Sequence, residues 1–450
     1  MKKTLLINLF TLLVTAIVSA QLPTIKASSK KVDINDGGQL SQGNWILNPE
    51  LELDIYKTKV EKGTKLVTFY TDQDSISFNV ERGKTYDFVI LLNEKDSCRH
   101  QINTIPDFNF TSSYVKKHKG TYSFEIPEVQ ELVHIMFAIT ATGKADENMV
   151  EKQTEYYKEV IAHFDAFASD KIIQDFDQLL KKGWYSVLKM DACSFNFEGN
   201  QIKKDSIYNK LSWSGPNYIE PYISEIEKFA KKTNFRDFYK AHLPYYDKLK
   251  MLMDEQTPIE KQWKWIEEQF NITYDNYRVT FSPLVYGNHS TNRFTQDDFK
   301  QTVMFICGPY EDESIDAILK EGVMSRIVFT EIDHNYVNPT SDKYTNEIKE
   351  ALSTLSKWAN TNALRNYRNP YDVFNEYMTF GVFTAYAMDN FSESDFVKIN
   401  ERVETLMSKH RGFIQFKAFN QFVIQLYGEN RTDKKFQELY PELIQWFNNQ

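Results

Sequence analysis

A glutamate and a histidine three positions apart, Glu331 and His334, are the side chains whose types and spacing best suit catalysis in this sequence. They lie in an apolar segment that runs from Met324 to Pro339. Because residues three or four apart share one face of a helix, this segment predicts a stripe on which both side chains stand together. Such a stripe can hold a metal ion or a reacting water molecule.

The same spacing occurs a second time, at Glu131 and His134. A glutamate followed three positions later by a histidine arises by chance in roughly one of every two chains of this length. The residues around the second pair alternate as they do in a strand, so we expect Glu131 and His134 to point to opposite faces of a sheet. Spacing alone is therefore weak evidence for a site.

The surroundings of the first pair distinguish it from the second. The segment from Thr330 to His334 resembles the active-site helix of zinc metallopeptidases, in which His-Glu-x-x-His supplies two zinc ligands and a general base. His334-Asn-Tyr-Val-Asn-Pro339 and the later Asn375-Glu376-Tyr377 are similar to a family of exported bacterial proteins that is known only as a zincin-like domain of unknown function. The resemblance implies that Glu331 is the catalytic general base and that His334 and Glu376 are zinc ligands.

One position departs from the family pattern, because Thr330 stands where the first zinc-binding histidine is expected. His334 and Glu376 are then the two strong ligands, whereas protein zinc sites usually have at least three. His289 and His242 are the imidazoles available as a third ligand. Two hypotheses follow. The protein is a secreted metallopeptidase-like hydrolase that acts on a peptide or protein substrate, or it is a non-catalytic protein that has lost the metal and binds a peptide or glycan.

Other chemistries leave no pattern in this sequence, which lacks the serine-hydrolase elbow, the phosphate-binding glycine loop and the dinucleotide fingerprint. The net charge of −9 argues against nucleic acid as a ligand, since phosphate binding needs a basic face. The three cysteines form at most one disulfide within the chain. Tyr336 and Tyr377 are candidates to donate a hydrogen bond to an oxyanion.

Residues 1–20 have the pattern of a secretory signal peptide. Lys2 and Lys3 precede an apolar run, and Val18-Ser-Ala20 ends it with small residues at the expected spacing. The run is too short for a typical membrane span. We therefore expect an exported chain, periplasmic or secreted, that begins at Gln21 and has no transmembrane segment.

The mature chain is expected to contain two domains, residues 21–145 and residues 146–450, and its fold class is predicted to be α+β. The first domain alternates with a period of two and predicts an antiparallel β-sandwich. Its expected strands are residues 66–70, 122–126 and 132–139, with a hairpin formed by 76–80 and 86–90 around Gly83.

The second domain has helical periodicity and is expected to be a mostly helical zincin-like domain with a small sheet. Strands near Tyr277 and Val303 are predicted to pair beside the Met324 helix, and Glu376 is predicted to reach His334 from a neighbouring helix. In zincin folds, the edge strand of such a sheet can receive an extended substrate by strand addition.

Overall fold

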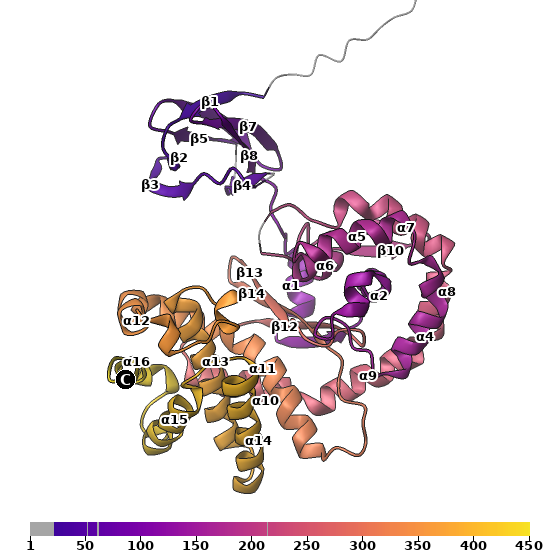
Figure 1. The fold of residues 1–450 in the computed structure, drawn as a ribbon, viewed down its shortest axis with the longest axis vertical. Coiled ribbons are helices and arrows are strands. Elements are labelled where there is room, and N and C mark those ends of the chain that lie inside the picture. Colours follow the sequence, from indigo (N-terminus) through magenta and orange to yellow (C-terminus); the bar gives the residue numbers. More distant parts are fainter. Residues whose placement is uncertain (1–21, 52, 61–62, 214) are drawn as a thin grey trace, which may run out of the picture. The chain divides into compact units, whose positions relative to one another are not determined.

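The computed structural model describes residues 22–51, 53–60, 63–213 and 215–450. The chain divides into two compact units between Pro106 and Asp107 (Figure 1). Each unit has its own buried apolar core. The predicted signal peptide, residues 1–20, lies outside the described residues.

The first unit consists of two four-stranded sheets, with strand orders β1-β7-β8-β4 and β3-β2-β5-β6. The strands are β1 (Thr24–Ala27), β2 (Lys31–Asp36), β3 (Gln39–Ile46), β4 (Asp54–Lys57), β5 (Thr64–Tyr70), β6 (Ser75–Glu81), β7 (Thr85–Leu92) and β8 (Asp96–Asn103). Both sheets contribute side chains to one core, in which Phe69 of β5 and Phe88 of β7 lie 4.8 Å apart between ring centroids. The predicted sandwich is confirmed, with parallel pairs only where β1 and β4 join the first sheet.

The predicted hairpin of residues 76–80 and 86–90 is wrong. The two strands exist, but β6 pairs with β5 in one sheet and β7 pairs with β8 in the other. The chain therefore crosses from sheet to sheet at Gly83, whose φ of +81° suits a glycine. Alternating side chains indicate one buried face on each strand, and they cannot tell a hairpin from a crossing because both strands face the same core.

A four-stranded sheet with the order β13-β14-β12-β9 lies in the second unit. Its strands are β9 (Thr121–Glu125), β12 (Asn276–Ser282), β13 (Ser290–Gln296) and β14 (Phe299–Cys307). β12 pairs in parallel with both β14 and β9, and β13 pairs antiparallel with β14. The predicted pairing of the strands near Tyr277 and Val303 is thus confirmed. A separate hairpin joins β10 (Phe195–Glu198) to β11 (Gln201–Lys204).

Helices make up most of the second unit, as predicted. They are α1 (Ser112–His118), α2 (Glu128–Ile139), α3 (Ala141–Ala145), α4 (Glu155–Phe164), α5 (Lys171–Lys181), α6 (Tyr185–Ala192), α7 (Ile223–Lys232), α8 (Phe235–Ala241), α9 (Leu243–Gln256), α10 (Ile259–Gln269), α11 (Ala317–Ser341), α12 (Thr345–Ala351), α13 (Pro370–Asn390), α14 (Glu393–Thr405), α15 (Phe416–Asn430) and α16 (Tyr440–Asn448). A π-helical turn, Leu406–His410, follows α14. Short 3-10 segments occur at Asp165–Phe167, Glu220–Tyr222, Asp342–Tyr344, Leu355–Lys357, Ala363–Arg365 and Phe436–Leu439.

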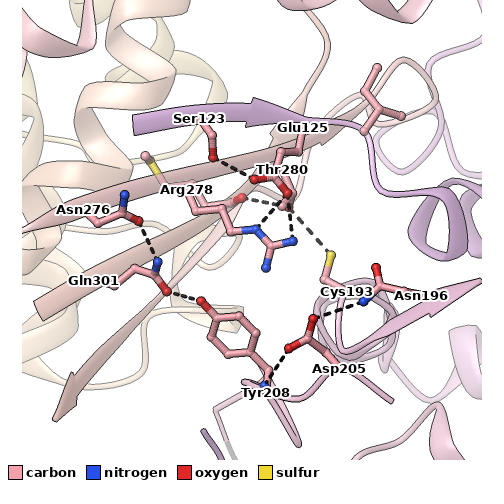
Figure 2. A network of polar contacts seen from close by, with 12 residues as sticks. Ser123, Glu125, Cys193, Asn196, Asp205, Tyr208, Asn276, Arg278, Thr280 and Gln301 are labelled. Carbon is pink, nitrogen blue, oxygen red and sulfur yellow. Dashed lines mark hydrogen bonds and ion pairs between the residues drawn. The ribbon is translucent and has the colours of Figure 1, made fainter. Parts of the chain in front are cut away.

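The predicted domain boundary near residue 145 is wrong, because residues 107–145 belong to the second unit. β9 pairs with β12, and the Glu125 carboxylate of β9 accepts a 2.9 Å hydrogen bond from Arg278 of β12 (Figure 2). Residues 132–139, predicted as a strand, lie instead in α2. Every residue of α2 from Val129 to Ile139 is buried, and periodicity does not distinguish a buried helix from a buried strand.

Among the described residues, no helix combines the length and the apolar character needed to span a membrane.

Candidate functional site

Two packed helices, α11 and α13, bring His334 and Glu376 together. Nε2 of His334 lies 3.8 Å from Oε1 of Glu376. Asp316 caps α11 by accepting from two backbone amides, and Asn369 caps α13 by accepting from the amide of Asp372, so both helices have well-defined first turns. The predicted meeting of Glu376 with His334 is therefore confirmed.

Arg411 binds the other oxygen of Glu376 at 2.7 Å, and the same guanidinium donates to the Tyr367 hydroxyl. Arg411 follows the π-helical turn after α14, and Tyr367 precedes α13. The side chain of Glu376 is 9% exposed, whereas those of His334 and Arg411 are 26% and 29% exposed. The carboxylate is thus held at the base of a group of side chains that solvent can reach.

Further positive charge surrounds this pair. Arg326 on α11 and Arg411 both lie over the ring of Phe380, at 5.8 and 5.0 Å from its centroid. Lys189 on α6 is fully buried and donates to the carbonyl groups of Asn288 and Phe305. Burial lowers the pKa of Lys189 to about 7, and the nearby Glu331 opposes that shift. The site therefore combines two carboxylates with several cationic side chains.

Glu331 is half-buried on α11, one helical turn before His334. Burial raises the pKa of its carboxyl group, and the neighbouring Glu376 adds to this rise. His334, Lys189 and Arg411 act in the opposite direction by favouring the carboxylate. A carboxyl group with a raised pKa is a stronger base once ionised, which suits Glu331 to accept a proton from water.

Thr330 occupies the expected position of the first zinc-binding histidine but faces its own helix. Its hydroxyl donates to the carbonyl of Ile327 at 3.2 Å, and the side chain is nearly buried. A hydroxyl engaged in this way contributes no strong metal ligand.

The two histidines considered as a third ligand lie in different surroundings. Both ring nitrogens of His242 are engaged, with Glu159 at 2.6 Å and with the Phe238 carbonyl at 2.7 Å. His289 lies in the loop before β13, and among the described residues its buried Nε2 has no hydrogen-bond partner. Burial lowers the pKa of His289 to about 3, with Lys189 adding to the effect. His289 is therefore neutral and nearer to the cationic groups of the site, whereas His242 is committed elsewhere.

The donors that the structure brings together make an incomplete zinc site. His334 and Glu376 supply two donors, and Arg411 engages one oxygen of the carboxylate that zinc would need. Within residues 22–450, leaving out positions 52, 61–62 and 214, no three histidine, cysteine, aspartate or glutamate side chains are grouped so as to hold a metal. A fixed guanidinium so close to the donors also repels a divalent cation.

The prediction that Tyr336 and Tyr377 donate a hydrogen bond to an oxyanion is wrong. Tyr336 is buried and shares a 2.6 Å hydrogen bond with the hydroxyl of Tyr277. Tyr377 is also buried and donates to the Trp358 carbonyl at 2.7 Å. Tyr367 is instead a tyrosine that contacts Arg411, and no helical periodicity marks it because it lies outside the helices.

The edge strand β13 is less open to a ligand than a zincin-like sheet would predict. The indole nitrogen of Trp213 donates to the Thr291 carbonyl at 2.7 Å. Next to it, the Asn292 side chain donates to the Leu211 carbonyl at 2.8 Å. Since these groups cover the outer side of β13 at Thr291, an extended ligand cannot pair with the strand there without displacing Trp213.

A second polar cluster lies at the β9 side of the sheet and borders a pocket of about 150 Å³ (Figure 2). The guanidinium of Arg278 binds Glu125, which also accepts from Ser123 at 2.8 Å. Tyr208 donates to Gln301 below them. Glu125 already balances the charge of Arg278, so we interpret this network as a structural link between β9 and β12 rather than a ligand site.

Comparisons of the chain with protein-family models, with curated proteins and with solved structures gave no match.

Proposed function

We propose that the second unit binds a peptide or glycan at the site formed by Glu331, His334 and Glu376, and that it does so without hydrolysing the ligand. The observation that carries this proposal is the 2.7 Å ion pair between Arg411 and Glu376. The guanidinium stays charged at any physiological pH and gives Glu376 the counter-charge that a metal would otherwise provide. We propose likewise that the protein acts outside the cytoplasm, as its predicted signal peptide implies.

The electrostatic argument favours binding over metal-dependent hydrolysis. A zinc ion bound to His334 and to Oε1 of Glu376 would share that carboxylate with the Arg411 guanidinium, which binds Oε2 at 2.7 Å. Two cations at one carboxylate that is 9% exposed repel each other, and this disfavours the metal. The positive side chains Arg326 and Arg411 instead suit a ligand that carries a negative group.

A zinc-dependent metallopeptidase-like hydrolase is the second candidate function. It is supported by the half-buried Glu331, whose pKa is raised by burial, one turn before His334. In this hypothesis His334 and Glu376 would hold the zinc ion, and Glu331 would serve as general base by accepting a proton from water. Zinc binding remains a prediction, and His289 is the residue to test first as an added ligand.

Calorimetric titration with zinc and a peptide-cleavage assay by mass spectrometry separate the two candidates. We expect the wild type and the Thr330→His variant to bind zinc weakly, because Arg411 remains in place. The double variant Thr330→His/Arg411→Met should bind zinc at least about a hundredfold more tightly, since it gains an i, i+4 imidazole pair and frees Glu376. Arg411→Met alone is the matched control for loss of the guanidinium.

Two outcomes would overturn the binding proposal. One is stoichiometric zinc in the purified wild type together with peptide cleavage that disappears in Glu331→Gln. The other is a wild type that binds neither extended peptides nor glycan fragments in a calorimetric screen. A His289→Ala variant that loses zinc bound by the wild type would identify the missing ligand and support the hydrolase instead.

A further inference from the structure

A cavity of about 170 Å³ opens between α11 and α14, beside the site. Its walls are Val323 and Arg326 from α11, Ile399, Arg402 and Val403 from α14, and Leu406 just beyond α14. The helices approach closely at Gly322, where an added Cβ would lie 2.6 Å from Cδ1 of Ile399. Ile399 and Val403 are buried, so the floor of this cavity is aliphatic.

The cavity carries two arginines and no carboxylate in its lining. Within the described part of the chain, neither Arg326 nor Arg402 forms an ion pair with an acidic side chain. Arg326 is half-buried, and burial together with the nearby Arg411 lowers its pKa to about 10. Arg402 is exposed at the rim. Because Arg411 already has Glu376 as its partner, the half-buried Arg326 is left without a paired carboxylate among the described side chains, and this favours a ligand with a negative group.

We propose that this cavity binds the free C-terminal carboxylate of a peptide whose last residue is aliphatic. The two guanidiniums suit the planar carboxylate, and the floor of Ile399 and Val403 suits the side chain next to it. The cavity is smaller than the several hundred Å³ typical of sites that enclose a whole small ligand, so it has room for one terminal residue rather than a long acyl chain.

The position of the cavity connects it to the site. Arg326 and Glu331 are five residues apart on α11, a rise of about 7.5 Å, and they lie about 140° apart around the helix axis. Arg326 and Arg411 both lie over the ring of Phe380, so this ring joins the cavity to the site. A peptide with its carboxylate at Arg326 therefore reaches the site past Phe380. This inference rests on the proposed function and assigns the end of the ligand that is recognised.

The test is fluorescence anisotropy with a labelled tetrapeptide ending in leucine, prepared both as the free acid and as the C-terminal amide. We expect the free acid to bind at least about tenfold more tightly than the amide, because the amide loses two charge-assisted contacts. Arg326→Met and Arg402→Met should each remove most of that preference. Arg402→Met changes an exposed residue and so tests the contact without disturbing the core.

Arg368→Met is the matched control, because Arg368 is an exposed arginine of the same unit away from the cavity. It should keep the full preference for the free acid. One outcome would overturn the carboxylate inference and leave the proposed function intact. In it, the free acid and the amide bind the wild type equally well, and both lose binding in His334→Ala. Absence of binding by both peptides would overturn the inference and count against peptide binding as the function. A preference for the free acid that survives in both Arg326→Met and Arg402→Met would also overturn it.

Discussion

Two helices of this protein carry a glutamate and a histidine at the same spacing, and they use them in opposite ways. On α2, Glu131 and His134 are almost completely buried, and the Glu131 carboxylate accepts a 2.7 Å hydrogen bond from Tyr156. On α11, the corresponding side chains are Glu331 and His334, which are only partly buried and face Glu376 and Arg411. The difference is not in spacing or in secondary structure, since both pairs are helical.

The comparison shows that surroundings decide what such a pair can do. Burial lowers the pKa of His134 to about 3 and raises that of Glu131 to about 7, so both side chains are mainly neutral over the acid range. Neutral groups enclosed by α4, α5 and α6 cannot meet a ligand, as the position of α2 among these helices shows (Figure 1). Partly exposed groups beside fixed charges, such as Glu331 and His334, can contact a ligand. The α2 pair is therefore structural, and the α11 pair is the candidate site.

The sharpest test of this comparison is the same substitution in both helices. His134→Ala should lower the free energy of unfolding by about 3 kcal/mol, because it empties a buried position packed against Phe137 and Tyr185. His334→Ala should cost less than about 1 kcal/mol, since the ring is 26% exposed and its contacts are long, 3.3 Å to Asn338 and 3.8 Å to Glu376. Urea denaturation measures both values. Equal losses would show that the two histidines have similar structural roles.

A smaller effect is expected in the pH dependence of stability. The folded chain keeps the Glu131 proton up to about pH 7, whereas the unfolded chain loses it near pH 4.5. Folding stability therefore falls as pH rises, and Glu131→Gln should gain about 2 kcal/mol relative to the wild type between roughly pH 5 and 7. Titrations that the wild type and the variant share, such as that of His134, cancel in this difference.

The matched variant is Glu331→Gln, measured over the same pH range. The pKa of Glu331 is also raised by burial, so Glu331→Gln should likewise gain folding stability relative to the wild type as pH rises. The gain should be smaller than for Glu131→Gln because the Glu331 side chain is only half-buried. If the difference between Glu131→Gln and the wild type stayed constant across the range, the carboxyl group of Glu131 would not be protonated in the folded chain.

The smallest effects concern one tyrosine beside each pair: Tyr156, which contacts Glu131, and Tyr367, which contacts Arg411. Tyr156→Phe removes a donor to Glu131 and a contact with the Tyr246 hydroxyl at 2.7 Å, and it should cost about 1–2 kcal/mol. Tyr367→Phe should cost about 0.5 kcal/mol or less, because Arg411 keeps its ion pair with Glu376. Thermal unfolding compares the two. A larger loss for Tyr367→Phe would mean that the α11 site also supports the fold.

The sequence predicted the parts of the site that lie on regular helices. The stripes around Glu331 and Glu376 predict α11 and α13, and the resemblance to zincin-like proteins predicts that Glu376 meets His334. Pro339 is an exception, because α11 continues two residues beyond it to Ser341. A proline in the last turn removes little helical bonding, so it does not end the helix there.

Arg411 and Lys189 could not be predicted in the same way. Each is an isolated basic residue far in sequence from Glu331, and only the packed fold brings them near it. The failure at α2 has another cause. Its residues are buried on all sides, so the one-sided stripe that identifies a surface helix is absent. Packing, rather than local pattern, determines both features.

The parallel pairing of β9 with β12 sets a condition on the order in which the chain folds. The Asn276 side chain donates to the Thr121 carbonyl across 155 positions of sequence. The sheet of the second unit therefore closes only after well over half of the chain has been synthesised, whereas β1–β8 all precede Pro106 and can fold early. Until β12 arrives, β9 lacks its partner strand. Molecular chaperones should consequently bind nascent chains at β9 for longer than at the first unit, because the strands of that unit find their partners within about the first hundred residues.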